Sequence, residues 1–261
     1  MSILLRLIRA FTAGGQDDGD VRPPGDRGAN HEHTVMTRAS RGEGVPPVWK
    51  SVLAVIAHPD DASFGLGAIL DAFIFAGARV EVFCLTHGQA WMLETAPGDL
   101  AMLRGAEMAS AADVLGPVRF KMEDCPDVAV GELCQMKLAT EVVATADSCH
   151  PDGLLVFDAP EVTGYRDHVS AALVALRAGE ILDLPVLGWS LSETVAEQLS
   201  REFGTSFTGH QDEQIDLRVA VDRARQRVAS RASSGKALPG SAARRRLELL
   251  AETESLRWLR A

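Results

Sequence analysis

Residues 52–67 read VLAVIAHPDDASFGLG, and the rest of the chain is organised around this stretch. It begins with an unbroken aliphatic run, which is typical of a strand buried on both faces of a sheet. The run stops at His58-Pro59-Asp60-Asp61, because proline cannot donate a hydrogen bond to a sheet ladder. In an open α/β sheet, ligands bind at the carboxyl ends of the strands. We therefore expect this histidine and these aspartates to lie at a ligand-binding edge.

A second stretch farther along the chain has the same organisation. Gly164-Tyr165-Arg166-Asp167-His168 follows the hydrophobic run 154–157 and opens a helical pattern. Imidazole and carboxylate are common zinc ligands, and a spare carboxylate beside them could act as a base for a metal-bound water. A histidine, an aspartate and a second histidine at two neighbouring strand ends thus indicate an open zinc site with three protein ligands. The alternative for HPDD is a solvated turn in which Asp61 or Ser63 caps the next helix.

Strand patterns and helical patterns alternate from residue 51 to residue 202. Such alternation predicts an α/β fold, namely a Rossmann-like, doubly wound and mainly parallel sheet of about five or more strands flanked by helices. Gly65-Leu66-Gly67 does not complete a dinucleotide-binding loop, because Leu70 stands where the third glycine would be. Gly67 is instead interpreted as a close helix–strand packing position. The expected strands are 51–57, 79–85, 117–122, 153–157, 185–191 and 216–222, and the expected helices are 64–77, 99–115, 131–147, 167–180, 192–202, 222–232 and 241–260.

Composition divides the chain into three parts. Residues 1–47 are rich in Gly, Pro, Asp and Arg without periodicity and are expected to form a disordered leader, with a short amphipathic segment at 1–11 and Met36 as an alternative start. Residues 48–216 carry 9 Lys and Arg against 26 Asp and Glu, whereas residues 217–261 carry 11 against 4. We expect the basic extension 217–261 to pack on the acidic main domain, or on that of another subunit in a homo-oligomer.

Composition also bears on nucleic-acid partners, membrane segments and disulfides. An acidic main domain argues against a nucleic acid as partner. No apolar run reaches the ~20 residues that span a bilayer, so no integral membrane segment is predicted. The cysteines form no paired spacing, and free thiols in a reducing cytoplasm are therefore expected. They are Cys84, Cys125, Cys134 and Cys149.

Four motifs occur together: AHPDD at 57–61, LTHGQ at 85–89, Arg104 with Glu107, and TGYRDH at 163–168. In this combination they resemble the LmbE/PIG-L family of zinc-dependent N-deacetylases. The resemblance covers about residues 50–190 and makes 48–216 the catalytic domain. It implies one zinc ion per chain, Asp60 as general base, and a ligand set of His58, Asp61 and His168. The chain departs from the family at Tyr165 and Gln89, where most members have His and commonly Glu.

Other candidates have more than one interpretation. The resemblance suggests that Arg104 holds substrate hydroxyls, although its spacing from Glu107 is also that of a surface ion pair. Asp124 is either a substrate contact or part of a solvated turn. Asp158 and Asp167 are predicted to support ligand histidines, which usually donate their second N–H to an acceptor. The remaining histidines considered, His87, His150 and His210, are expected in turns or at the surface.

The resulting hypothesis is a zinc-dependent hydrolase of linear amides. It would remove an N-acetyl or other N-acyl group from an amino sugar or its conjugate, a small-molecule substrate, with Asp60 accepting the proton of the attacking water. Tyr165 is either a donor to the oxyanion or a ring packed at the pocket rim. The alternatives are an amidase for a larger acyl conjugate and a non-catalytic metal- or sugar-binding protein that kept the pocket.

Overall fold

A seven-stranded sheet forms the centre of the computed structural model, which describes residues 44–88, 114, 116, 118–126, 129–158, 162–163, 165–233 and 241–261. The chain divides into two units, Met1–Arg38 and Ala39–Ala261, and the described residues all belong to the second. The strand order is β3-β2-β1-β4-β5-β7-β6, and the first five strands in this order are parallel. The predicted doubly wound, mainly parallel sheet is thereby confirmed. The strands are β1 Ser51–Ile56, β2 Arg79–Thr86, β3 Val118–Cys125, β4 Gly153–Phe157, β5 Val186–Ser190, β6 Leu217–Ala220 and β7 Thr253–Arg260.

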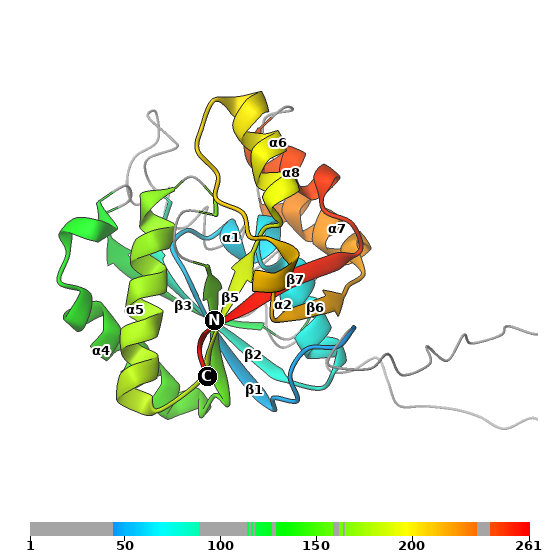
Figure 1. Ribbon diagram of the computed structural model, residues 1–261. Helices are drawn as coiled ribbons and strands as arrows, with labels where there is room; N and C mark the ends of the chain where they lie inside the picture. Colours follow the sequence, from blue (N-terminus) through cyan, green and yellow to red (C-terminus); the bar gives the residue numbers. More distant parts are fainter. Residues whose placement is uncertain are drawn as a thin grey trace, which may run out of the picture. The chain divides into compact units, whose positions relative to one another are not determined.

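Helices cover both faces of this sheet (Figure 1). Alternate residues of β1 belong to two different clusters, because successive side chains of a strand point to opposite faces. One cluster includes residues of α2 and the other includes residues of α4 and α5. The unbroken aliphatic run of β1 is thus explained by burial from both sides. The helices are α1 Asp61–Phe64, α2 Gly67–Phe75, α4 Gln135–Cys149, α5 Arg166–Leu182, α6 Glu193–Phe203, α7 Arg223–Ser233 and α8 Ala242–Leu249, with short 3-10 turns η2 Val130–Glu132 and η3 Asp212–Gln214.

The helix predicted for 241–260 is wrong in its second half. α8 ends at Leu249, Leu250 is extended, and β7 follows. β7 pairs antiparallel with β5 on one side and with β6 on the other. Arg, Glu and Leu favour helices when only local propensity acts. The edge of β5 would otherwise present unpaired backbone groups, and pairing with it outweighs that propensity.

The first predicted helix is also divided. α1 begins at Asp61, earlier than expected, and Gly65 and Leu66 separate it from α2. The expected helix 99–115 and the leader 1–47 lie largely or entirely outside the described residues. None of the helices in the described ranges has the length and apolar character needed to cross a bilayer. The predicted free thiols are confirmed for all four cysteines, of which Cys84 and Cys125 are buried.

The basic C-terminal extension pairs with the acidic body through several ion pairs. Their carboxylates lie on α2, on α6, after β4 and after α5. The excess of positive charge beyond residue 217 therefore corresponds to contacts within the chain. The pairs are Arg225–Asp71, Arg245–Glu202, Arg257–Asp158 and Arg260–Asp183.

Candidate metal centre

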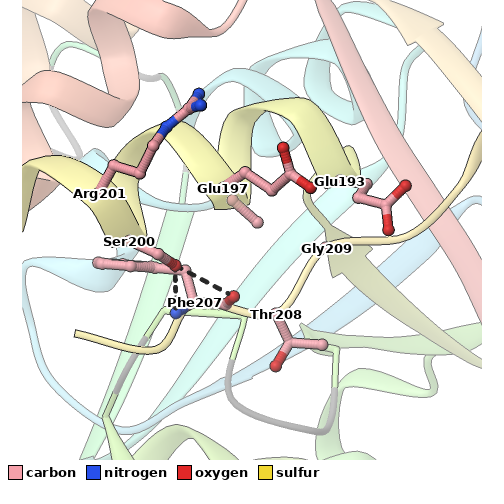
Figure 2. A pocket seen from close by; sticks show the side chains of 8 residues that line it. Glu193, Glu197, Ser200, Arg201, Phe207, Thr208 and Gly209 are labelled. Carbon is pink, nitrogen blue, oxygen red and sulfur yellow. Dashed lines mark hydrogen bonds between the residues drawn. The ribbon is translucent and has the colours of Figure 1, made fainter. Parts of the chain in front are cut away.

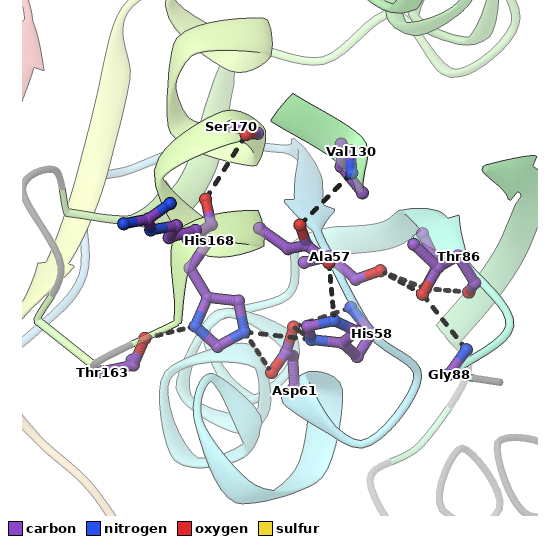
Figure 3. Close-up of polar contacts among 12 residues, drawn as sticks. Ala57, His58, Asp61, Thr86, Gly88, Val130, Thr163, His168 and Ser170 are labelled. Carbon is purple, nitrogen blue, oxygen red and sulfur yellow. Dashed lines mark hydrogen bonds and ion pairs between the residues drawn. The ribbon is translucent and has the colours of Figure 1, made fainter. Parts of the chain in front are cut away.

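The two motifs meet at one edge of the sheet because β1 and β4 are neighbouring parallel strands. His58 lies just beyond the end of β1, and Asp61 is the first residue of α1. The backbone N–H of His58 donates to Asp61 Oδ2 at 2.8 Å, which turns this carboxylate toward the histidine. Figure 3 shows the resulting group of polar contacts. The local chain path thus places the ends of HPDD in one buried site.

His168 reaches the same place from the first turn of α5. Its Nδ1 contacts the hydroxyl of Thr163, and its ring stacks on that of Phe157 with centroids 4.5 Å apart. Phe157 is the last residue of β4, and Gly65 makes room for it, since a Cβ at position 65 would lie 2.2 Å from Phe157 Cζ. The residue that permits close helix–strand packing is therefore Gly65, whereas Gly67 packs against Gln226 of α7.

Three candidate ligand atoms converge. His58 Nδ1 lies 3.3 Å from His168 Nε2, and Asp61 Oδ1 lies 3.0 Å from that same nitrogen. Asp61 Oδ2 is 3.7 Å from His58 Nδ1. All three side chains are buried, and one ligand atom of each lies within 4.8 Å of the others. Because Asp61 is buried against both histidines, the alternative of a solvated turn is wrong.

The outer ring nitrogens already have partners. His58 Nε2 lies 3.3 Å from Asp167 Oδ2, and His168 Nδ1 contacts Thr163. These contacts leave the two facing nitrogens and the carboxylate as an inward set of nitrogen and oxygen donors. That set fits zinc in an open catalytic site, where three protein ligands leave one position for water or substrate.

The electrostatics of Asp61 agree with a ligand role. Burial by itself raises the pKa of this carboxyl, but the charge and hydrogen bonds of His168 and His58 bring the net pKa below its ordinary value. Asp61 is therefore ionised at neutral pH. An ionised carboxylate is the form that binds a divalent cation.

Tyr165 lies at the rim of this group. The residue is 41% exposed, and the centroid of its ring lies 5.4 Å from that of His168 and 6.4 Å from that of His58, in edge-on orientations. Burial and the negative charges of Asp60 and Asp61 raise its pKa above the ordinary value, although Arg246 opposes them. The phenol therefore keeps its proton throughout the neutral range.

The two aspartates predicted to support the ligands lie in different places. Asp167 contacts His58 and also accepts from the backbone N–H of Val130 at 3.3 Å, so it adjoins a candidate ligand. Asp158 instead contacts His210 Nε2 at 2.9 Å and Arg257 Nη1 at 2.8 Å. This corrects the prediction for Asp158, and also that for His210, which is buried. The unexpected strand β7 carries Arg257, whose Nη1 reaches both Asp158 and His210.

The remaining candidates lie farther out or outside the described residues. Asp124 has a 95% exposed side chain and pairs with His87 Nε2 at 2.7 Å. Arg104 and Gln89 lie outside the described residues. Sequence reasoning assigned no role to Thr163, although it stands inside the TGYRDH motif. It also missed Arg246, a buried arginine of α8 whose position follows from tertiary packing alone.

A separate hollow of about 530 Å³ lies along α6 (Figure 2). Its polar wall includes Glu193, Glu197 and Arg201, and the Ser200 hydroxyl accepts from the backbone N–H of Phe207 at 3.0 Å. No residue of the His–Asp–His group lines it. We assign no chemistry to this hollow.

With the site in view, the chain can be compared with known proteins. Residues 53–178 match the family model described as PIG-L, GlcNAc-PI de-N-acetylase. These residues form a PIG-L domain. The resemblance indicated by the four motifs is thereby confirmed, and the matched segment contains Asp60 and all three candidate ligands. The rest of the sheet, from β5 onward, lies beyond the segment that matches the PIG-L model.

Two curated relatives of the PIG-L domain are named deacetylases. One is 1D-myo-inositol 2-acetamido-2-deoxy-alpha-D-glucopyranoside deacetylase 1 of Catenulispora acidiphila, 26% identical over 178 residues, which are 57% of this chain and 55% of the relative. The other is diacetylchitobiose deacetylase of Thermococcus kodakarensis, 26% identical over 140 residues, or 52% of this chain and 51% of the relative. The chain thus spans about half the length of these relatives.

Solved structures share the fold over about four fifths of this chain. The N,N'-diacetylchitobiose deacetylase of Pyrococcus horikoshii aligns with a TM-score of 0.60 at 17% identity, covering 81% of this chain and 84% of that one. A 4-carboxy-2-hydroxymuconate hydratase of Pseudomonas putida aligns with a TM-score of 0.60 at 16% identity, covering 81% and 97%. One fold thus carries proteins named for two different reactions, and the reaction has to be argued from the site.

Proposed function

We propose that this protein is a zinc-dependent N-deacetylase that hydrolyses the linear amide of an N-acetylated amino sugar or its conjugate. One observation carries the proposal: His58 Nδ1, His168 Nε2 and the Asp61 carboxylate converge in a buried site while the outer ring nitrogens are engaged by Asp167 and Thr163. This donor set suits one zinc ion per chain. The named deacetylases among the relatives of the PIG-L domain support the same reaction.

The mechanism assigns a separate task to each residue. His58, Asp61 and His168 would hold the zinc ion, whose Lewis acidity would make a water easier to deprotonate at neutral pH. Asp60, next to the ligand Asp61 in the chain, takes the proton of the attacking water and returns it to the leaving amine. Asp167 keeps the ring of His58 oriented and strengthens its basicity.

Tyr165 is the proposed donor to the oxyanion that forms at the acyl carbonyl. Its ring borders both histidines, and its raised pKa keeps the hydroxyl protonated. A histidine at this position, as in most family members, would lose its proton near ~6.5 in the absence of other influences, whereas an ordinary phenol keeps its proton up to ~10. A neutral donor is weaker than a charged one. Tyrosine in place of histidine therefore favours activity over a broader pH range at the expense of the highest turnover rate.

The substrate class follows from the relatives of the PIG-L domain. They are named for an acetamido sugar linked to inositol and for diacetylchitobiose, and both names describe N-acetylated amino sugars. Arg104 and Asp124 are proposed to contact the sugar. An amidase for a larger acyl group and a binding protein without turnover remain the alternatives, since Tyr165 and Gln89 depart from the family motif.

The test is release of free amine from N-acetylglucosamine–inositol and from diacetylchitobiose, before and after chelation and after return of zinc. We expect activity that the chelator abolishes and zinc restores, with about one zinc per chain by elemental analysis. Turnover only of longer N-acyl substrates would favour the amidase. Bound metal without turnover of any amide would favour the binding protein, and absence of bound metal would contradict the proposal.

A further inference from the structure

The helix that carries Asp61 is too short to hold itself in place. α1 has four residues, Asp61–Phe64, whereas isolated helices shorter than ~12 residues are marginal in water. The position of α1 therefore depends on what packs against it, and the local bond from the His58 N–H to the Asp61 carboxylate can form only where α1 is held. Two side chains from the C-terminal extension contact the end of this helix, and both come from residues beyond the PIG-L match.

Arg246 of α8 makes the first contact. Its Nη2 donates to the carbonyl oxygen of Phe64 at 3.3 Å, and its guanidinium lies 5.0 Å from the ring centroid of Trp189. The residue is only 6% exposed, and its Nε is buried without a hydrogen-bond partner among the described residues. Burial lowers its pKa, while the charges of Asp61, Glu254, Tyr165 and Asp60 oppose this. A buried cation thus lies at the end of the helix that begins with Asp61.

Gln226 of α7 makes the second contact. Its Nε2 donates to the carbonyl oxygen of Gly65 at 3.4 Å, and its Oε1 accepts from Arg223 Nη1 at 2.9 Å. Arg223 also pairs with Glu254 at 2.6 Å, and both of these side chains are fully buried. Glu254 in turn accepts from Trp189 Nε1 at 2.6 Å. A buried polar network therefore joins β5, β7 and α7 to the end of α1.

We propose that Arg246 and Gln226 are positioning residues of the metal centre, holding α1 against the sheet so that Asp61 faces the two histidines. This inference rests on the proposed zinc site and extends it to the C-terminal extension. Hydrogen bonds to two successive carbonyls, Phe64 and Gly65, restrict both translation and rotation of so short a helix. The Trp189 ring beside the guanidinium limits how far Arg246 can move, so its donor stays at the end of α1.

The experiment compares R246M with R245M, a matched change one residue earlier on α8. Arg245 pairs with Glu202 and Glu248 at the surface, while methionine at 246 keeps apolar contact with Trp189 and loses the donor. Cobalt alone is the probe, and its dissociation constant is measured from the visible absorption of the bound ion. We expect R246M to weaken cobalt binding by about tenfold or more and R245M to stay within about twofold of the wild type.

A second readout needs no metal. The amides of Phe64, Gly65 and Leu66 donate within α1, to the carbonyls of Asp60 and Asp61. Their hydrogen exchange in the metal-free protein should be about fivefold or more faster in R246M than in R245M, because α1 opens locally. R246K, which keeps the charge and a donor, should give values between those of the wild type and R246M.

The outcomes separate two failures. Cobalt affinity and α1 exchange that are both unchanged in R246M would overturn the positioning role while leaving the zinc site intact. If R246M does not fold, R246K decides: weaker cobalt binding and faster α1 exchange than in the wild type support the role, and wild-type values overturn it. A wild-type protein that binds no cobalt would contradict the proposed function. Hydrogen exchange of the α1 amides would still decide whether α8 holds this helix.

Discussion

Replacement of Gly65 by alanine tests whether close packing behind the metal centre fixes His168. The added Cβ would lie 2.2 Å from Phe157 Cζ and 2.6 Å from Cε1. Ordinary contact begins at 3.4 Å, so the ring or the helix must move by about 1.2 Å. The ring has little freedom, because His168 stacks on it at 4.5 Å and Trp189 meets it edge-on at 5.3 Å. The displacement should therefore reach His168.

Two magnitudes follow for G65A. Overpacking of this kind lowers the free energy of unfolding by ~1–3 kcal/mol. A shifted metal ligand should weaken metal binding by ~10-fold or more. Thermal unfolding of the metal-free protein measures the first effect, and titration with cobalt measures the second.

Gly153 provides the matched control because it begins β4, the strand that ends with Phe157. A Cβ there would meet Trp49 Cη2 at 2.4 Å, a comparable overlap far from the centre. G153A should therefore lose similar stability and keep its metal affinity. Adding F157L to G65A should restore part of the affinity by giving the new methyl group room. Metal binding in G65A as tight as in G153A, at equal loss of stability, would refute the transmission of packing to His168.

Four further predictions concern the chemistry and the leader. D60N should keep its metal while turnover falls by ~10²–10⁴-fold, whereas D61N should lose metal affinity, and equal metal loss in both would contradict the assigned roles. Because the pKa of Asp61 is lowered in the fold, its ionised carboxylate stabilises the metal-free protein at pH values above 3.8, the ordinary pKa of this group. This stabilisation is lost as the pH falls below 3.8. The stability of D61N should therefore depend less on pH in acid than that of the wild type. Y165F should lower kcat by ~10-fold or more without loss of metal, and an unchanged kcat would make Tyr165 a packing residue. The activity of the wild type should persist toward pH 10, since the pKa of Tyr165 is raised from 10.0. A chain that begins at Val48 should keep its fold and its activity, as circular dichroism and amine release would show. Loss of folding would mean that residues before Val48 support the body, either the segment 1–11 or Gly44, whose backbone bonds to that of Arg218 and Ala220.

The sequence was most informative where residues near one another in the chain decide the structure. The aliphatic run ending at Pro59 predicts a strand buried on both faces with polar groups at its end, and β1 has this form. The grouping of His58 with Asp61 also follows from local geometry, because the turn between β1 and α1 brings Asp61 back toward the end of the strand. The second histidine could be added because two strand ends in one parallel sheet share an edge.

Predictions failed where distant residues compete for the same group. Asp158 follows β4 as expected, but Arg257 and His210 engage its carboxylate once β7 pairs with β5. No local feature of residues 250–260 reveals that pairing, since their composition also suits a helix. The same holds for Arg246, which is one of three successive arginines in the sequence and differs from its neighbours only in being buried.

The sequence by itself thus determined the sheet class and the edge that carries the site, because strand burial and the effect of proline act over short stretches, and it indicated the three candidate ligands from the polar groups at two strand ends. Only the tertiary structure decided which nitrogen of each histidine faces the centre, which carboxylate supports His58 and what holds the short helix behind Asp61. Those features depend on contacts between elements far apart in the chain. The energy of such contacts comes from burial and from hydrogen bonds that exist only after the elements have packed together.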